Sequence, residues 1–464
     1  MLGHLDPVLL SRIQFAFVIA FHILFPASTI GLASWLAVLQ WRWMKTKNSV
    51  YGDVYHMWLK IFAVAFGMGV VSGVVMSFQF GTNWAGFADK AGNIIGPMLG
   101  YEVLTAFFLE ASFLGVMLFG ENRVGRKTYF ASNIIVAAGT LLSAFWILAV
   151  NSWMQTPRGF RIAQNGLLFP VDWKQIVFSP SLPYRFFHMV TAAYLTTAFG
   201  VGGVGAYYLL RNRHVKQARV MFGMAMIMAI FVAPLQLFLG DAHGRNTLEY
   251  QPEKVAAMEG LWKTQRGAPS ILFGWPDQKD EVTKYAIEIP KLSSLILTHN
   301  LNGRVVGLDH WPKNDRPPVP VVFIAFRVMV GLGVLMILTG LTALVLYFRK
   351  RLFDTRWFLR WCEVMSPAGY IALLAGWCVT ETGRQPWVIY GIMRTSRAVS
   401  PVTGLTVALS ICGFVLTYGV VFGSGVHYIL KLIRKGPEAE GEIYGSHGLS
   451  KPPLITDPAS KKDS

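Results

Sequence analysis

Apolar stretches recur nine times along the chain, and most of them are long enough to cross the hydrocarbon core of a bilayer, which is roughly 30 Å thick. Of the 464 residues, 53% are hydrophobic and only 14% are charged. This pattern predicts an all-α integral membrane protein with nine transmembrane helices. The predicted spans are residues 11–40, 58–80, 99–120, 130–150, 186–210, 221–240, 320–348, 367–382 and 402–432.

Basic residues gather after every odd-numbered span. The clusters are Arg42 to Lys47, Arg123 to Lys127, Arg211 to Arg219, Arg349 to Arg360 and Lys431 to Lys435. Because short cytoplasmic loops carry an excess of Lys and Arg, the N-terminus is expected outside and the C-terminus in the cytoplasm. The net charge of +17 is therefore interpreted as membrane topology, and no nucleic-acid partner is expected.

The longest connection between spans covers residues 241–319 and is expected on the outer side. Loops of this length are usually functional or disordered. We therefore divide the chain into helices 1–6 at 1–240, this external loop, helices 7–9 at 320–435 and a flexible cytoplasmic tail at 436–464.

Glu381 stands at the end of an apolar run that reads Gly-Trp-Cys-Val-Thr-Glu-Thr-Gly-Arg-Gln-Pro-Trp over residues 376–387. An ionisable side chain at the edge of the lipid is costly and usually functional. One interpretation is a structural ion pair with Arg384. The other interpretations are a haem-iron ligand or a proton relay, and the residues alone leave all three open.

Two histidines, His22 and His188, lie clearly within spans. Each is either a core histidine bonded to a neighbouring helix or an axial haem ligand. Met329 lies at a depth similar to that of His188, so a His/Met haem site is one possibility, although most methionines are core filler. Arg327, two residues earlier, suits a haem propionate or a carboxylate.

Glu102 and Glu110 are two acids in the third span. They are eight residues apart, roughly two helical turns, so they are expected to face a similar side. Glu110, near the middle of the membrane, suits a proton relay. A copper–haem oxidase core is excluded because it needs about six membrane histidines for its metals, and the spans of this chain offer too few.

The chain resembles subunit I of the bd-type quinol oxidases over residues 9–435. The resemblance rests on motifs that include Phe-Gln-Phe-Gly-Thr-Asn-Trp at 78–84, Ala-Phe-Phe-Leu-Glu at 106–110, Trp-Met-Gln-Thr-Pro at 153–157, Gln-Pro-Glu-Lys-Val-Ala-Ala-Met-Glu at 251–259, Phe-Arg-Val-Met-Val at 326–330 and Gly-Arg-Gln-Pro-Trp at 383–387.

The resemblance implies three haems. His188 and Met329 would ligate a low-spin haem b. His22 and Glu381 would ligate a high-spin haem b and a haem d, or a further haem b in its place, in an order that stays open. The resemblance also places Glu102 and Glu110 beside the haem pair and on the proton path. Lys254 and Glu259 would take part in quinol oxidation in the external loop. Arg327 and Trp377 would contact haems, and Asn151 would lie near the haems. Arg384 is expected to be free for a haem propionate.

The external loop lacks a long insertion, as in the branch of the family that includes cyanide-insensitive enzymes. The resemblance further implies a bacterial inner-membrane oxidase that takes electrons from quinol, with ubiquinol favoured, and reduces O2 without pumping protons. Its expected partners are a multi-span subunit II and a small single-span subunit. A haem b electron-transfer subunit that does not reduce O2 and an ion transporter are the alternatives.

Overall fold

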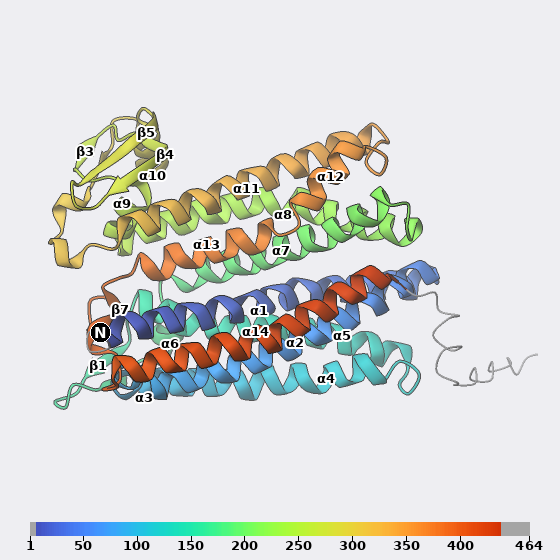
Figure 1. Ribbon diagram of the computed structural model, residues 1–464, viewed down its shortest axis with the longest axis horizontal. Coiled ribbons are helices and arrows are strands. Elements are labelled where there is room, and N and C mark those ends of the chain that lie inside the picture. The colour runs from blue at the N-terminus through green and yellow to red at the C-terminus, as the bar shows by residue number, and fades with distance from the viewer. Residues whose placement is uncertain (1–5, 438–464) are drawn as a thin grey trace, which may run out of the picture.

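The computed structural model describes residues 6–437, so nearly all of the predicted tail lies outside the described residues. Within them, nine helical segments are long and apolar enough to cross a membrane. Figure 1 shows them side by side along the long axis of the molecule. They are α1 (Pro7–Thr46), α2 (Ser49–Thr82), α3 to α4 (Ala85–Glu102 and Phe108–Phe119), α5 (Arg126–Gln155), α6 to α7 (Trp173–Val177 and Leu182–Leu210), α8 (Val215–Tyr250), α11 (Val319–Phe348), α12 to α13 (Arg356–Val364 and Ala368–Thr382) and α14 (Gly404–Lys435).

Each predicted span falls on one of these segments, which confirms the all-α membrane fold. The local sequence explains several helix ends. Asp6 caps the first turn of α1, where Pro7 takes a position that needs no hydrogen-bonded N–H. Lys47 then adopts the left-handed conformation and ends α1, and Asn48 caps α2.

The sixth helix is longer than the sequence indicated. The apolar run ends at Gly240, but α8 continues through ten more residues to Tyr250. Residues 241–250 are polar yet contain no proline, and the next proline, Pro252, begins the short helix α9 (Pro252–Glu259). The first part of the predicted external loop is therefore helical.

Close helix contacts are made at small residues. α1 packs against α2, α5 and α7, and α11 packs against α8 and α13. A Cβ added to Gly31 of α1 would lie 2.8 Å from the carbonyl oxygen of Ala193 in α7. A Cβ on Gly369 of α13 would lie 2.5 Å from the Cα of Thr196. Such contacts let backbones approach where lipid, unlike water, does not drive helices together.

The long connection that was predicted to lie outside folds into a small unit of its own, which we call the external unit. It lies at the same end of the bundle as the start of α1 (Figure 1). Its elements are α9, β3 (Gln265–Arg266), β4 (Ser270–Asp277), β5 (Val282–Ile289), α10 (Leu292–Thr298) and β6 (Arg304–Val305). Strands β4 and β5 form an antiparallel hairpin, and β3 pairs with β6. Two further hairpins, β1 (Phe160–Ile162) with β2 (Leu168–Pro170) and β7 (Trp387–Ile389) with β8 (Met393–Arg394), connect helices.

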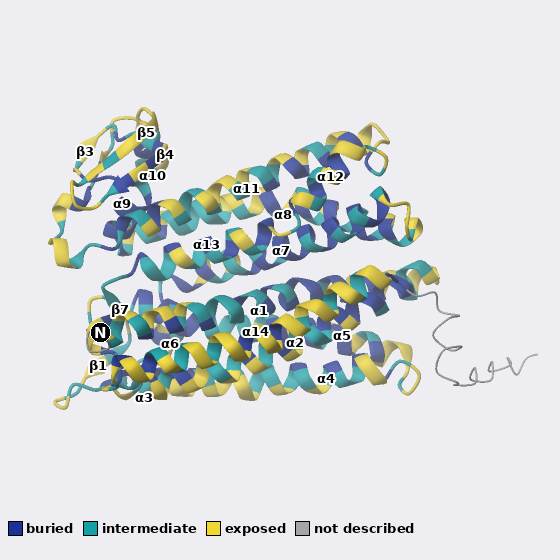
Figure 2. Cartoon of the chain, viewed as in Figure 1, coloured by how far each residue is buried: buried dark blue, intermediate teal, exposed yellow. Residues whose placement is uncertain are grey.

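Burial follows the pattern of a membrane bundle (Figure 2). Aromatic side chains such as Tyr55, Tyr208 and Phe222 are fully buried between helices. Large apolar side chains on the outer faces, such as Phe231 and Leu416, remain exposed. Apolar outer faces on long helices suit contact with lipid or another membrane subunit.

Candidate functional site

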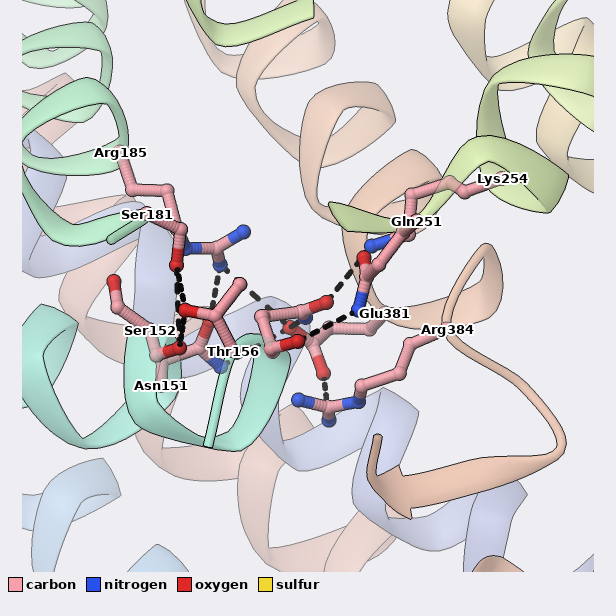
Figure 3. A network of polar contacts seen from close by, with 10 residues as sticks. Asn151, Ser152, Thr156, Ser181, Arg185, Gln251, Lys254, Glu381 and Arg384 are labelled. Carbon is pink, nitrogen blue, oxygen red and sulfur yellow. Dashed lines mark hydrogen bonds and ion pairs between the residues drawn. The ribbon is translucent and has the colours of Figure 1, made fainter. Parts of the chain in front are cut away.

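Glu381, at the end of α13, lies in a network of polar side chains contributed by several helices (Figure 3). Asn151 donates a hydrogen bond to Glu381 Oε1 at 3.0 Å, and Gln155 Nε2 donates to the same oxygen at 3.2 Å. Arg384 pairs with the other carboxylate oxygen, and Arg185 of α7 lies 4.0 Å from Oε1. The ion pair that the sequence left open is formed, but as one part of a larger network.

This network carries more buried positive than negative charge. The side chains of Arg185, Arg384 and Lys254 are only 6%, 5% and 3% exposed, and Glu381 is the carboxylate that pairs with both arginines. Three guanidinium nitrogens, Arg185 Nε and Arg384 Nε and Nη1, are buried without a partner. Because buried charges are costly unless they are paired, the cluster suits an anionic group that the chain itself does not contain.

Lys254 connects the external unit to this cluster. It lies on α9, and its Nζ donates to Gln155 Oε1 at 2.8 Å. Burial lowers the pKa of Lys254 well below its usual value, and the nearby charges of Arg185 and Arg384 lower it further. Gln251 Nε2 also donates to the backbone carbonyl of Gln155 at 3.0 Å. Gln155 was not among the predicted site residues, although it lies within the Trp-Met-Gln-Thr-Pro motif.

Glu259, at the other end of α9, faces a different neighbour. Its Oε2 accepts hydrogen bonds from Arg327 Nη2 at 3.2 Å and from Ser293 at 2.9 Å. Arg327 also donates from Nε to the carbonyl of Ile271 at 2.5 Å and from Nη1 to the carbonyl of Met258 at 3.2 Å. Of the two options predicted for Arg327, the structure places it against a carboxylate of the external unit.

Glu253 is a second buried acid on α9 that the sequence analysis did not single out. It is 6% exposed, and its Oε2 has no hydrogen-bond partner. Burial raises its pKa, which a hydrogen bond with Tyr390 and the charge of Lys254 only partly offset. Its type and place in a loop motif were visible in the sequence, but its burial was not.

His22 of α1 contacts α2. Its Nδ1 lies 3.0 Å from the hydroxyl of Ser72, an arrangement that orients the ring. A Cβ on the next residue, Gly73, would lie 3.2 Å from His22 Cε1. The glycine therefore leaves room for the imidazole ring.

His188 of α7 is held against α8. Its Nδ1 is buried without a partner, and its Nε2 lies 3.4 Å from Gln236 Nε2. A Cβ on Gly240 would lie 3.3 Å from the ring. The ring of His243, which belongs to the extension of α8, is centred 5.5 Å from that of His188. His243 was not among the predicted site residues, because the apolar run that marks this helix ends at Gly240.

Met329 of α11 lies against α13. A Cβ on Gly376 would lie 3.0 Å from the Met329 sulfur. The neighbouring residue, Trp377, is half-buried and packs against two separate clusters of buried apolar side chains. Gly73, Gly240 and Gly376 thus each stand beside one predicted iron ligand.

Glu102 and Glu110 are brought to one side of their helix by an irregular turn. Eight residues of regular α-helix would leave two side chains roughly 80° apart. The π-helical turn η1 (Val103–Phe107) lies between them and takes up about one extra residue. Both acids consequently meet α5, where Ser143 donates to Glu102 at 2.7 Å and Gly139 lies against Glu110. Glu110 is 6% exposed, and its Oε1 has no partner.

These features fit haem. Among residues 6–437, no group of three or more His, Cys, Asp or Glu side chains could hold a metal ion by itself. An iron at His22, His188, Met329 or Glu381 would therefore need further ligands, which a porphyrin supplies. The unpartnered imidazole nitrogen of His188 suits a ligand, and the unpartnered guanidinium nitrogens suit propionates.

Comparison with known proteins identifies the family. The family model described as cytochrome bd terminal oxidase subunit I matches residues 10–437. This chain belongs to that family. The resemblance predicted from the motifs is confirmed, and the chain is a multi-pass protein of the bacterial inner membrane and a subunit of a haem-binding oxidoreductase.

Relatives of known name match over nearly the whole length. Cytochrome bd ubiquinol oxidase subunit 1 of Bacillus subtilis (strain 168) is 35% identical, with 99% of this chain and 98% of the relative covered. Cytochrome bd-II ubiquinol oxidase subunit 1 of Escherichia coli (strain K12) is 33% identical, with 94% and 98% covered. A solved structure of bd oxidase from Geobacillus thermodenitrificans has a TM-score of 0.88 at 32% identity, covering 94% of this chain and 100% of that one.

Proposed function

We propose that this chain is the haem-bearing catalytic subunit of a terminal quinol oxidase. It oxidises quinol at the outer face and reduces O2 to water with cytoplasmic protons. The observation that carries this proposal is the buried connection from Lys254 in the external unit, through Gln155, to Glu381 in the bundle. A candidate quinol-binding group and a candidate iron ligand thus belong to one network.

Four side chains would hold three haems. His188 and Met329 would ligate a low-spin haem b. His22 and Glu381 would ligate a high-spin haem b and a haem d, or a further haem b in its place. When bound, the haems carry the electrons from quinol and provide the site of O2 reduction. Each of these four residues lies in or at the end of a membrane helix.

The residues around the proposed iron ligands would bind the haem propionates and orient the ligands. Arg384 and the neighbouring Arg185 would hold propionates with their unpartnered guanidinium nitrogens. Asn151 orients the Glu381 carboxylate through its 3.0 Å hydrogen bond. Trp377, one residue after Gly376, would lie against a haem ring.

Quinol would bind near Lys254 and Glu259, the two ends of α9. The lowered pKa of Lys254 favours its neutral amine, which can accept a hydrogen bond from a quinol hydroxyl that is losing a proton. The released protons leave to the outside, while Glu102 and Glu110 deliver protons from the cytoplasm. Charge separation then follows without pumping.

The proposed partners are a multi-span subunit II and a small single-span subunit, with ubiquinol as the favoured donor and no nucleic acid. The proposed orientation places the N-terminus outside and the C-terminus in the cytoplasm. The helix ends that the basic clusters follow gather at the end of the bundle opposite the external unit (Figure 1), which supports this orientation.

The test is a reduced-minus-oxidised spectrum of the purified complex with and without CO, together with haem extraction and quinol-dependent O2 uptake. We expect low-spin haem b, a CO-reactive haem and O2 consumption. A low-spin signal without any CO-reactive haem would contradict the proposal, because it would indicate an electron-transfer subunit. The absence of haem would point to a transporter.

A further inference from the structure

We propose that Gln155 is a positioning residue that couples the external unit to the carboxylate of Glu381. This inference rests on the proposed function, because it takes Glu381 as a haem-iron ligand. It adds a role for a residue at the end of α5 that neither binds iron nor contacts quinol in that proposal.

The contacts of Gln155 place it between the two groups. Its side chain is 2% exposed. The amide oxygen accepts a hydrogen bond from Lys254 Nζ at 2.8 Å, and the amide nitrogen donates to Glu381 Oε1 at 3.2 Å. Its backbone carbonyl accepts from Gln251 at 3.0 Å. One residue therefore contacts α9, the residue that precedes α9, and α13.

A neutral amide is the side chain that this position requires. An amide offers an acceptor for the Nζ–H of Lys254 and a donor for the carboxylate of Glu381 at the same time. A carboxylate here would face Glu381 with like charge. An apolar side chain would leave two buried polar groups, Lys254 Nζ and the Glu381 carboxylate, without these hydrogen bonds, which is costly.

The coupling acts through the strength of one hydrogen bond. When Lys254 holds the amide oxygen, the amide is polarised and its N–H is a stronger donor to Glu381. A carboxylate that receives a stronger hydrogen bond gives less electron density to a bound iron, which favours the reduced metal. Loss of the Lys254 contact should therefore lower the midpoint potential of the haem that Glu381 ligates.

The experiment is potentiometry of the purified, haem-loaded complex, following the spectral component that is absent in Glu381→Ala. We expect Gln155→Met to shift the midpoint of this component downward, and Gln155→Glu to shift it further because of the added negative charge. Lys254→Met should shift it downward in the native background but not in the Gln155→Met background. Gln251→Met is the matched control, since it removes only the bond to the Gln155 backbone, and it should leave the midpoint unchanged.

An unchanged midpoint in Gln155→Met, or a Lys254→Met shift of equal size in both backgrounds, would overturn the coupling while leaving the proposed function intact. If the complex with Gln155→Met does not assemble, the midpoint potentials of Gln155→Glu and Lys254→Met test the inference instead. An unchanged midpoint potential in both variants would overturn it. If the haem spectrum of Glu381→Ala lacks no component of the native spectrum, the assignment of Glu381 as an iron ligand, on which the inference rests, would be overturned instead.

Discussion

Arg327 and Glu259 form an ion pair, with 3.2 Å between Nη2 and Oε2, that fastens the end of α9 to α11. The guanidinium also lies over the ring of Phe323, 4.5 Å from its centroid. Arg327 stands two residues before Met329, so the same short stretch of α11 serves the external unit and a predicted iron ligand.

Arg327→Leu should weaken the attachment of the external unit. The substitution removes three hydrogen bonds and leaves the largely buried Glu259 carboxylate unpaired, at a cost of about 2 kcal/mol. We expect a lower thermal midpoint and faster proteolysis within residues 260–318. Lys284→Met is the control, because its ion pairs with Asp277 and Asp280 are exposed to solvent and their loss should affect stability much less. Equal effects of the two variants would contradict the prediction.

Met329→Leu should remove the low-spin haem spectrum. Leucine fills a similar volume but offers no sulfur to iron, so the fold should persist while the ligand is lost. The reduced-minus-oxidised spectrum of the purified complex measures the effect. A low-spin band unchanged from the native protein would refute the assignment of Met329.

Gly376→Ala should perturb the same spectrum from the facing helix. The new methyl group would lie 3.0 Å from the Met329 sulfur and would force the side chain to move. We expect a shifted or weakened low-spin band. Gly331→Ala on α11 is the matched control, because a Cβ there meets nothing within 4 Å. Should the control disturb the band as much as Gly376→Ala does, steric contact with Met329 is not the cause.

The sequence predicted the membrane fold because hydropathy and loop charge are local properties of the chain. Predicted ligands such as His22 and His188 were visible for the same reason, since polar groups are rare inside apolar runs. The polar extension of α8 was not visible, because hydropathy no longer marks a helix beyond Gly240. The different directions of Lys254 and Glu259 were not visible either, since they depend on which helices pack around α9.

Glu253→Gln should stabilise the protein in a pH-dependent way. Burial raises the pKa of Glu253, so the native state favours its protonated form, and the stability tied to that form is lost as the pH rises through the native pKa. The neutral amide avoids this loss. The gain in thermal midpoint over the native protein should therefore grow from acidic to alkaline pH and vanish below the ordinary carboxyl pKa of about 4.

The groups facing Glu253 are Tyr390, Lys254 and Asp315, and none of them is changed in this experiment. Glu249→Gln is the control, because Glu249 is exposed on α8, less than two turns away along the chain. A pH-independent difference between Glu253→Gln and the native protein would refute the assignment of a raised pKa to Glu253.

Gly139→Ala should slow oxygen reduction without removing haem. A Cβ at this position would lie 2.7 Å from Glu110 Cγ and 3.0 Å from a methyl group of Leu109, so Glu110 must leave the place that the π-helical turn gives it. A misplacement of about 1 Å in a proton-transfer group can cost up to about 100-fold in rate, and we expect at least a roughly tenfold loss of quinol-dependent O2 uptake. Gly115→Ala in α4 meets nothing within 4 Å and should keep the native rate. Glu110→Gln should reproduce the loss with normal haem spectra. A native rate in both Gly139→Ala and Glu110→Gln would exclude Glu110 from the proton path, whereas a loss confined to Gly139→Ala would assign the effect to helix packing.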